Sequence, residues 1–264
     1  MLELSQEEMA FHYHIGTSGW HYEHWREIFY PEKLTKAEWL EFYASHFITV
    51  ELNNSFYRLP SEAAFATWYN SSPPNFTFAV KVSRFITHIK RLKNTGEAVE
   101  NFISRAKNLR EKLGPLLYQL PPNMHRNDEV LDSFLSSLPR EMKHVVEFRH
   151  QSWLEEKVFE ILRKYNVGLC VFDMPSFTCP LLTTADFAYI RFHGSGALYS
   201  SCYSDEELAD WAKRIADLDT NLKAVYIYFN NDVEGFAVRN AKTLRDYLKT
   251  QQGVKGVKID KSPL

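Results

Sequence analysis

Polar and ionisable side chains recur two residues apart at the ends of short apolar runs in this 264-residue chain. One apolar residue separates the two members of each pair. A β-strand points residues i and i+2 to the same face, so both members of a pair should face the same side of a sheet. The pairs are Glu51 and Asn53, Lys81 and Ser83, Glu147 and Arg149, Arg191 and His193, and Tyr228 and Asn230, while Gln119 and Asp173 end two further runs.

These residue types suit the binding of a small anion and the movement of protons on it. Lys81, Arg149 and Arg191 supply three cations, and a guanidinium holds a carboxylate or phosphate through two parallel hydrogen bonds. His193 is a candidate general acid or base, because an imidazole titrates at a pH of about 6.5. Its candidate partners in proton transfer are Asp173, Glu147 and Glu51.

A structural role is equally open for the deeper residues of this set. Ions in a barrel core are costly unless they pair with each other or meet a ligand. The deeper residues could therefore form a closed network of salt bridges that orients the layer above; they are Glu51, Lys81, Glu147 and Arg191. We expect function at the rim, where barrel enzymes carry their chemistry. The rim residues are Asn53, Arg149, Asp173, His193 and Asn230.

A loop with two glycines follows the predicted seventh strand. Gly194 and Gly196 permit close approach of the backbone, and barrels often bind anions there through backbone N–H groups. We assign both glycines to substrate binding, with a plain flexible turn as the alternative. Further candidates for substrate binding are Asn53, Gln119, Tyr228 and Asn230, together with Trp20 and Tyr57, whose rings could line a pocket or simply pack.

Metal and cofactor chemistry has weaker support. The carboxylates and His193 could ligate a divalent metal ion, but three neighbouring cations disfavour a permanently occupied metal site. The sequence contains no P-loop, GxSxG, HExxH or EF-hand motif, and nothing specific for NAD or flavin. We therefore assign no metal ligand and predict no cofactor, with a divalent metal as the alternative.

The elements that must position these residues alternate regularly along the chain. Eight short runs rich in Val, Ile, Phe and Tyr are typical of strands, and amphipathic runs between them are typical of helices. The strands are predicted at 13–17, 49–53, 76–82, 116–120, 144–149, 167–173, 188–193 and 224–230. Capping boxes predict helix starts at Thr35 with Glu38, Ser152 with Glu155, and Ser204 with Glu207. The irregular stretch 174–186 predicts a short or missing helix.

Eight strand–helix units predict a single (β/α)8 TIM barrel, in which the carboxyl ends of all strands meet at one mouth. An open doubly wound sheet is the alternative. It predicts a GxGxxG motif after the first strand, and Gly16 and Gly19 do not have that spacing. The predicted divisions are an N-terminal leader at 1–11, the barrel at 12–250 and a C-terminal tail at 251–264.

The composition of the chain limits which partners it can bind and in which cell compartment we expect it. The formal net charge is −2, and no long basic run is present, which argues against nucleic-acid binding. No apolar stretch is long enough to span a membrane, and the first ten residues lack the apolar region of a secretion signal. Cys170, Cys179 and Cys202 are scattered and form no CxxC pair, so we expect no zinc site or disulfide framework. A cytoplasmic protein of open oligomeric state is expected.

Eight sequence motifs follow one another along the chain in a characteristic order. They are IGTSGWHYEHWREIFYP (15–31), ELNNSFYRLP (51–60), FAVKVSRFITHIKRL (78–92), LGPLLYQLPPN (113–123), VEFRHQSW (146–153), FDMP (172–175), YIRFHG (189–194) and VYIYFNNDVEG (225–235). This order resembles the domain-of-unknown-function 72 family, also called YecE-like, over nearly the whole chain. The resemblance implies a TIM barrel of the kind placed near xylose-isomerase-like barrels. It implies no reaction, so it transfers no catalytic residue.

The leading functional hypothesis is an enzyme that acts on a small phosphorylated or carboxylated metabolite, including sugar derivatives. It would use acid/base chemistry at the carboxyl-end mouth of the barrel, with hydrolase, lyase and isomerase reactions all open. One alternative is a non-catalytic barrel that binds a ligand or a partner. Another, by fold analogy alone, is a metal-assisted phosphodiester hydrolase.

Overall fold

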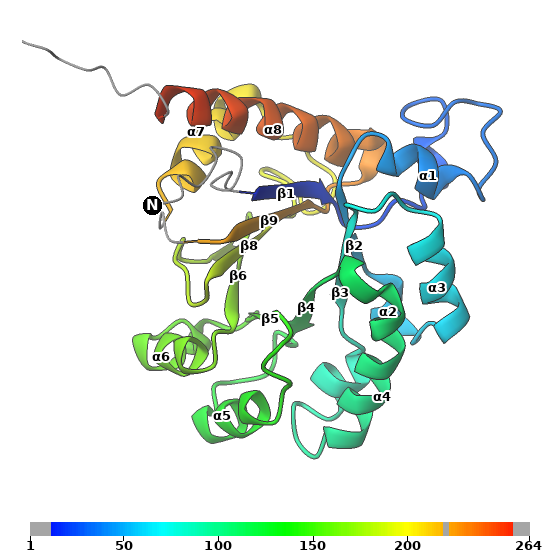
Figure 1. The fold of residues 1–264 in the computed structure, drawn as a ribbon. Coiled ribbons are helices and arrows are strands. Elements are labelled where there is room, and N and C mark those ends of the chain that lie inside the picture. The colour runs from blue at the N-terminus through cyan, green and yellow to red at the C-terminus, as the bar shows by residue number, and fades with distance from the viewer. Residues whose placement is uncertain (1–11, 219–221, 256–264) are drawn as a thin grey trace, which may run out of the picture.

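A computed structural model describes residues 12–218 and 222–255, which form a barrel of parallel strands inside a layer of helices (Figure 1). The strands pair in the order β1-β9-β8-β6-β5-β4-β3-β2, as a (β/α)8 barrel requires, so the predicted fold is confirmed. Their bounds are β1 (His12–Thr17), β2 (Thr49–Leu52), β3 (Thr77–Lys81), β4 (Leu113–Gln119), β5 (His144–Glu147), β6 (Gly168–Met174), β8 (Phe187–Phe192) and β9 (Ala224–Phe229).

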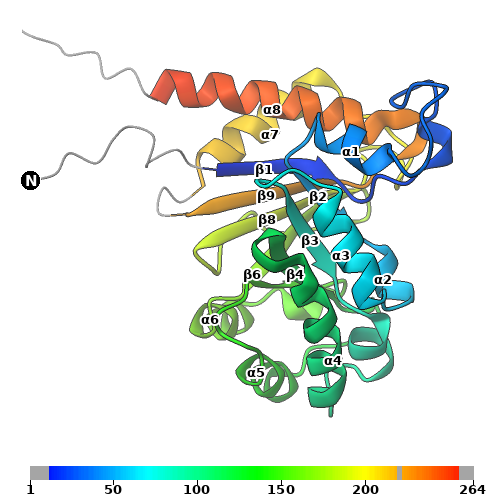
Figure 2. The same ribbon diagram turned by 45° about the vertical axis from the view of Figure 1, so that its right-hand side comes forward.

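Helices cover the outside of the barrel (Figure 2). They are α1 (Trp39–Ala44), α2 (Asn54–Tyr57), α3 (Glu62–Asn70), α4 (Gly96–Ala106), α5 (Asp128–Ser136), α6 (Glu156–Lys164), α7 (Asp205–Ala216) and α8 (Phe236–Lys255). Short 3-10 helices lie at Glu23–Trp25, Lys107–Lys112, Gln151–Trp153 and Val233–Gly235, and a π-helix lies at Phe85–Ile89. In the irregular stretch after β6 the described chain forms a two-residue strand, β7 (Phe177–Thr178), instead of a helix, as predicted.

One of the three predicted capping boxes forms as expected. The Ser204 hydroxyl accepts from the Glu207 N–H at 3.2 Å, and the Glu207 carboxylate accepts from the Ser204 N–H at 2.7 Å, where α7 begins. The prediction at Ser152 is wrong, because its hydroxyl accepts the Arg126 N–H from a neighbouring loop. The α6 helix begins only after Glu155.

The third predicted capping box, Thr35 with Glu38, forms its hydrogen bonds but lies before the start of the helix. The Glu38 carboxylate accepts hydrogen bonds from the Thr35 N–H and hydroxyl at 2.9 and 2.6 Å. The α1 helix nevertheless begins at Trp39, after a turn that contains this contact. The Thr35–Glu38 pair therefore stabilises the turn before the helix, and the predicted start at Thr35 is wrong.

Side chains, in place of a strand ladder, close the seam of the barrel between β1 and β2. The two strands are the ends of the hydrogen-bonded order. The Tyr43 hydroxyl bridges them, because it accepts from the Thr17 N–H at 2.9 Å and donates to the Thr49 carbonyl at 3.0 Å. Gly16 allows this close approach, since a Cβ atom there would lie 2.2 Å from the Thr49 carbonyl oxygen.

The lower interior of the barrel is packed with apolar and aromatic side chains. They are Ala79, Leu117, Val145, Cys170, Phe187, Tyr189, Ala224, Tyr226 and Tyr228. A larger buried cluster fills the space between the strands and the helices. Charged side chains replace apolar ones only toward the carboxyl ends of the strands, which places them above a closed floor. The predicted leader at 1–11 lies outside the described residues, as do residues 256–264 of the predicted tail.

Candidate functional site

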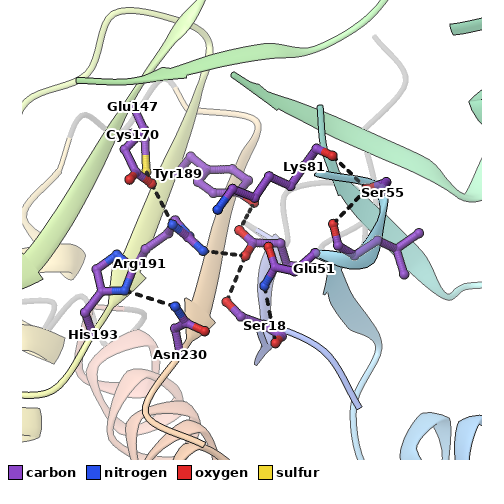
Figure 3. A network of polar contacts seen from close by, with 12 residues as sticks. Ser18, Glu51, Ser55, Lys81, Glu147, Cys170, Tyr189, Arg191, His193 and Asn230 are labelled. Carbon is purple, nitrogen blue, oxygen red and sulfur yellow. Dashed lines mark hydrogen bonds and ion pairs between the residues drawn. The ribbon is translucent and has the colours of Figure 1, made fainter. Parts of the chain in front are cut away.

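Three buried ions form the base of the barrel mouth. Arg191 on β8 donates to Glu147 on β5 at 2.7 Å and to Glu51 on β2 at 2.8 Å (Figure 3). All three side chains are at most 1% exposed. Each carboxylate has further donors: Glu51 accepts from the Ser18 hydroxyl at 2.8 Å and the Tyr189 hydroxyl at 2.6 Å. The predicted convergence of these strands is thus present, in the form of a buried ion-pair network, in which the Arg191 Nε alone lacks a hydrogen-bond partner among the described residues.

Arg149 lies above this network and links it to His193. Its Nε donates to Glu147, and its Nη2 lies 3.0 Å from the His193 Nε2. The remaining nitrogen, Nη1, contacts only the Met174 sulfur at 3.1 Å, and the guanidinium lies 4.5 Å from the centre of the Phe172 ring. A thioether is a weak acceptor, so one edge of the Arg149 guanidinium is poorly satisfied.

His193 is fully buried and is held in one tautomer by its neighbours. A guanidinium only donates, so the Nε2 next to Arg149 must be the acceptor nitrogen. The proton then sits on Nδ1, which lies 3.2 Å from the side-chain amide of Asn230 and can donate to its oxygen after an amide flip. Burial, followed by the charges of Arg191 and Arg149, holds the pKa of His193 well below its usual value. His193 is therefore neutral in this state.

Lys81 on β3 stands apart from the ion-pair network. Its side chain extends toward Arg191 and Tyr189 in Figure 3, and its ammonium lies 4.4 Å from the centre of the Phe56 ring. Within the described part of the chain, no ion pair or hydrogen bond to the Lys81 nitrogen is formed. Burial, followed by the charge of Arg191, lowers the pKa of Lys81 to about 8. Three of the four predicted members of the salt-bridge network are therefore present, and Arg149 joins them through Glu147 in place of Lys81.

Glu147 is an ionised counterion of two arginines. Burial by itself would raise the pKa of Glu147, but the Arg149 and Arg191 guanidiniums outweigh it and hold this pKa well below its usual range. Both oxygens of Glu147 already accept from the two arginines. In this state Glu147 has little capacity to take a proton from a substrate.

The Asp173 side chain does not meet the His193 ring, although the Asp173 carbonyl accepts the His193 N–H at 3.0 Å. Alternation along β6 points Cys170 into the barrel, where it packs with the floor, while Val171 packs in the outer cluster. Asp173 has the same parity as Val171, and it accepts a hydrogen bond from the Tyr203 hydroxyl at 2.7 Å. It faces the helical layer, so its predicted partnership with His193 is wrong.

Two other predicted residues differ in depth. Tyr228 is fully buried in the floor, and its hydroxyl lies 2.7 Å from the Thr49 hydroxyl, so a ligand at the mouth does not reach it. Gln119 ends β4 and pairs in register with Glu147, which places it beside the network and on the inner face. Only Gln119 keeps a position suited to the predicted binding role.

The loop after β8 does not form the predicted anion nest. Gly194 has a φ of 105°, a value that favours glycine, but its N–H donates to the Tyr203 hydroxyl at 3.1 Å. The Gly196 N–H donates to the Ser201 hydroxyl at 3.0 Å. Both amides are used inside the loop, so neither is free for an anion in this conformation.

The aromatic candidates divide between a pocket and the outer surface. A pocket of about 220 Å3 adjoins the network; its lining includes Ser18, Trp20, Tyr22, Asn53 and Trp68. The Asn53 amide donates to the Ser18 carbonyl at 3.4 Å, and its buried Oδ1 has no hydrogen-bond partner. Tyr57 is 74% exposed and lies outside this pocket. Trp20 and Asn53 therefore share a site next to the mouth, and Tyr57 does not.

Sequence reasoning missed several residues that complete the mouth. Ser18 directly follows β1, and Tyr189 lies two residues before Arg191 on the same face of β8, so the strand-end and parity rules could have found both. Met174 and Phe172 contact Arg149 from β6. These two residues are apolar, so a search for ionisable pairs passes over them.

Two further observations concern metals and membranes. Across residues 12–218 and 222–255, no three or more His, Cys, Asp or Glu side chains are arranged to hold a metal ion. None of the helices described has the length and apolar character to cross a membrane.

Comparisons with known proteins agree with this architecture. The family model described as "Protein of unknown function DUF72" matches residues 14–263. The chain is 26% identical to UPF0759 protein YunF of Bacillus subtilis (strain 168), over 89% of this chain and 94% of that protein. It is 35% identical to UPF0759 protein YecE of Escherichia coli (strain K12), over 42% of this chain and 41% of that protein. The crystal structure of a DUF72 family protein from Thermotoga maritima MSB8 superposes with a TM-score of 0.81 at 33% identity, covering 90% of this chain and 99% of that one. The sequence and its barrel together place this chain in the DUF72 family.

Proposed function

We propose that this protein is an enzyme that binds a small phosphorylated or carboxylated metabolite at the carboxyl-end mouth of its barrel. The observation that carries the proposal is the charge balance of the mouth. Three cations, Lys81, Arg149 and Arg191, face two carboxylates, and Arg191 and Arg149 already occupy both. Among the described residues the Lys81 ammonium forms no ion pair, and one edge of Arg149 has a thioether as its acceptor. An anionic ligand supplies the acceptors that both groups lack.

Binding of an anion by Arg149 would also release the base of this site. The His193 Nε2 accepts a hydrogen bond from the Arg149 Nη2 at 3.0 Å. An oxyanion that takes this guanidinium edge leaves the His193 Nε2 free to accept a substrate proton, while Glu147 keeps the Arg149 Nε in place. We therefore assign proton transfer to His193 and no longer to Asp173 or Glu147. Asn230 fixes the tautomer of His193.

A non-catalytic ligand-binding barrel is the second candidate, and one observation favours it. Both carboxylates of the mouth are saturated with donors, so the site holds no free acid partner for His193. Both candidate functions require an anion bound at the mouth. They differ in whether the protein then converts the bound compound.

Binding of an anion is tested by thermal and urea unfolding of the full chain in the presence of inorganic phosphate, pyruvate or glucose 6-phosphate. A ligand at 100 times its Kd stabilises the folded state by about 2.7 kcal/mol. We expect this shift in the wild type and its loss in Lys81→Met and Arg149→Met. The Lys81→Met variant should be at least as stable as wild type without ligand, because it removes a half-buried cation that has no ion pair among the described residues. That result separates lost binding from damaged folding.

The matched control is Lys223→Met. Lys223 pairs with Asp186 at 2.7 Å on the surface, away from the mouth. The Lys223→Met variant should show the same stabilisation by each anion as the wild type. Anion binding that survives both mouth substitutions would rule out the proposed site.

A further inference from the structure

Lys112 and Lys81, which both lie at least partly inside the fold, are held in opposite ways. Lys112 is 5% exposed, and its ammonium donates to the Tyr69 carbonyl and the Ser72 carbonyl at 2.6 Å each and to the Ser72 hydroxyl at 3.0 Å. Three acceptors satisfy an ammonium completely, so Lys112 is a structural cation. Lys81 has none of these acceptors in the described chain, although it also lies inside the fold.

The surroundings of Lys81 favour the neutral amine. Burial and the neighbouring Arg191 lower its pKa, and they outweigh the charges of Glu147 and Glu51. The Phe56 ring, 4.4 Å from the nitrogen, favours the cation and is outweighed as well. With a pKa of about 8, roughly one-tenth of Lys81 is the free amine at pH 7, against about 0.04% for an ordinary lysine. A free amine on a strand end, above a closed apolar floor, is a nucleophile held at the base of a binding site.

We propose that Lys81 is the covalent nucleophile of this site and condenses with the aldehyde or ketone carbon of a small anionic substrate. This inference rests on the proposed function, since Arg149 would hold the carboxylate or phosphate of that substrate. The Lys81 nitrogen forms a bond to the carbonyl carbon, and the π electrons of the C=O bond move to oxygen. The oxygen then leaves as water, and the C–N bond becomes a protonated imine. The ammonium and carbonyl yield iminium and water, so atoms and charge balance and no oxidant is needed.

The mouth holds the groups that such an intermediate requires. The imine draws electrons from the neighbouring carbon, which weakens a C–H or C–C bond there. The His193 Nε2, once Arg149 turns to the anion, is the acceptor for the proton that leaves. Glu51 and Glu147 are fixed by Arg191, and their charges, which favour the cationic form of Lys81, would also stabilise the positive iminium. The class of reaction is therefore an imine-dependent lyase or isomerase step.

The test is reductive trapping on the full wild-type chain. The protein is incubated with pyruvate, and separately with dihydroxyacetone phosphate, in the presence of sodium cyanoborohydride, and the modified peptide is identified by mass spectrometry. We expect the peptide with Lys81 to gain the reduced probe on the order of tenfold faster than surface lysines, because its amine is less protonated. The rate should rise with pH and level off above a pH of about 8, the pKa of Lys81.

Matched controls lie within the same molecule. Lys164 and Lys223 are paired surface lysines that report background labelling. Lys81→Arg keeps the positive charge and should still bind phosphate, but it should show no trapping at position 81.

Failure of this inference and failure of the proposed function give different results. If neither probe labels Lys81 above Lys164 and Lys223 while inorganic phosphate still stabilises the protein through Arg149, the imine chemistry is excluded and the anion site stands. If phosphate binding is absent as well, both proposals fall.

Discussion

At the scale of single residues, the mouth depends on how Arg191 is compensated. A buried guanidinium between two carboxylates exchanges its hydration for the hydrogen bonds to Glu51 and Glu147. Burial would lower the pKa of Arg191, but the two carboxylates reverse this and hold it well above the usual value. Because all three ions are desolvated together, removal of one leaves its partner with less compensation for the lost hydration.

This interdependence predicts the effect of Glu51→Gln. The substitution keeps the shape of the side chain but leaves Arg191 with one counterion and turns an acceptor of the Tyr189 hydroxyl into a weaker one. We expect a loss of about 3–5 kcal/mol in the free energy of unfolding, the usual result of breaking a buried ion pair. Urea denaturation measures it.

The surface pair of Lys223 and Asp186 provides the comparison for Glu51→Gln. Its members are 76% and 33% exposed, so Lys223→Met should leave the free energy of unfolding almost unchanged. A loss for Glu51→Gln as small as that of Lys223→Met would show that the deep network contributes little to folding.

At the scale of elements, the seam between β1 and β2 decides whether the mouth is assembled. Ser18 follows β1 and binds Glu51 on β2 at 2.8 Å, so the two strand ends must approach closely for Glu51 to be held. Tyr43 from α1 joins the same strands one step below. The seam thus couples the closure of the barrel to the position of a site carboxylate.

Gly16→Ala tests this coupling. The added Cβ would lie 2.2 Å from the Thr49 carbonyl and 2.9 Å from the Tyr43 hydroxyl, so β1 must move outward. We expect at least about 1–3 kcal/mol of destabilisation from overpacking, together with weaker phosphate binding, because Ser18 moves with the strand. Unfolding curves with and without phosphate measure both effects.

A second glycine is the control for the seam. A Cβ at Gly96, the first residue of α4, meets nothing within 4 Å. Gly96→Ala should therefore be neutral or stabilise by up to about 1 kcal/mol through the unfolded state. Equal effects of the two substitutions would contradict the seam argument.

At the scale of the whole molecule, the concentration of buried titratable groups in one mouth makes folding sensitive to acid. His193 has a folded-state pKa well below its usual value, so the unfolded chain binds a proton that the folded chain does not as the pH falls below about 6.5. Glu147 adds a second proton difference below a pH of about 4.5, since its folded-state pKa is also depressed. Both differences remove stability as the pH falls.

We therefore expect the free energy of unfolding to fall as the pH drops from about 6.5, by at most about 1.4 kcal/mol per pH unit for each proton difference. His193→Asn removes one titrating group and should flatten this decline between a pH of about 6.5 and 5. Urea titrations at several pH values provide the measurement. An unchanged slope in His193→Asn would mean that the protonation state of His193 is not linked to folding.

The spacing of polar residues along a strand explains which site residues the sequence predicted correctly and which it did not. Glu51, Glu147 and Arg191 were placed on the inner face because each has a polar neighbour two residues on, and pairs at this spacing mark one face of a strand. Asp173 has no such neighbour; it shares its parity with Val171, which packs outward, and single polar residues at strand ends carry no information on direction. Gly194 and Gly196 have the composition of an anion nest, but their amides bind Tyr203 and Ser201, whose positions depend on the folded loop.

The local periodicities of two and 3.6 residues were enough to determine the eight strand–helix units and the barrel, because each unit shows its apolar face within a short window of sequence. Only the tertiary structure decided which charges neutralise each other. Residues 51, 147 and 191 meet across the barrel at distances that depend on strand tilt and register, and no local pattern encodes these. Within the part of the chain that the structure describes, the same geometry leaves Lys81 without an ion pair, because Arg191 and Arg149 already bind the two nearby carboxylates.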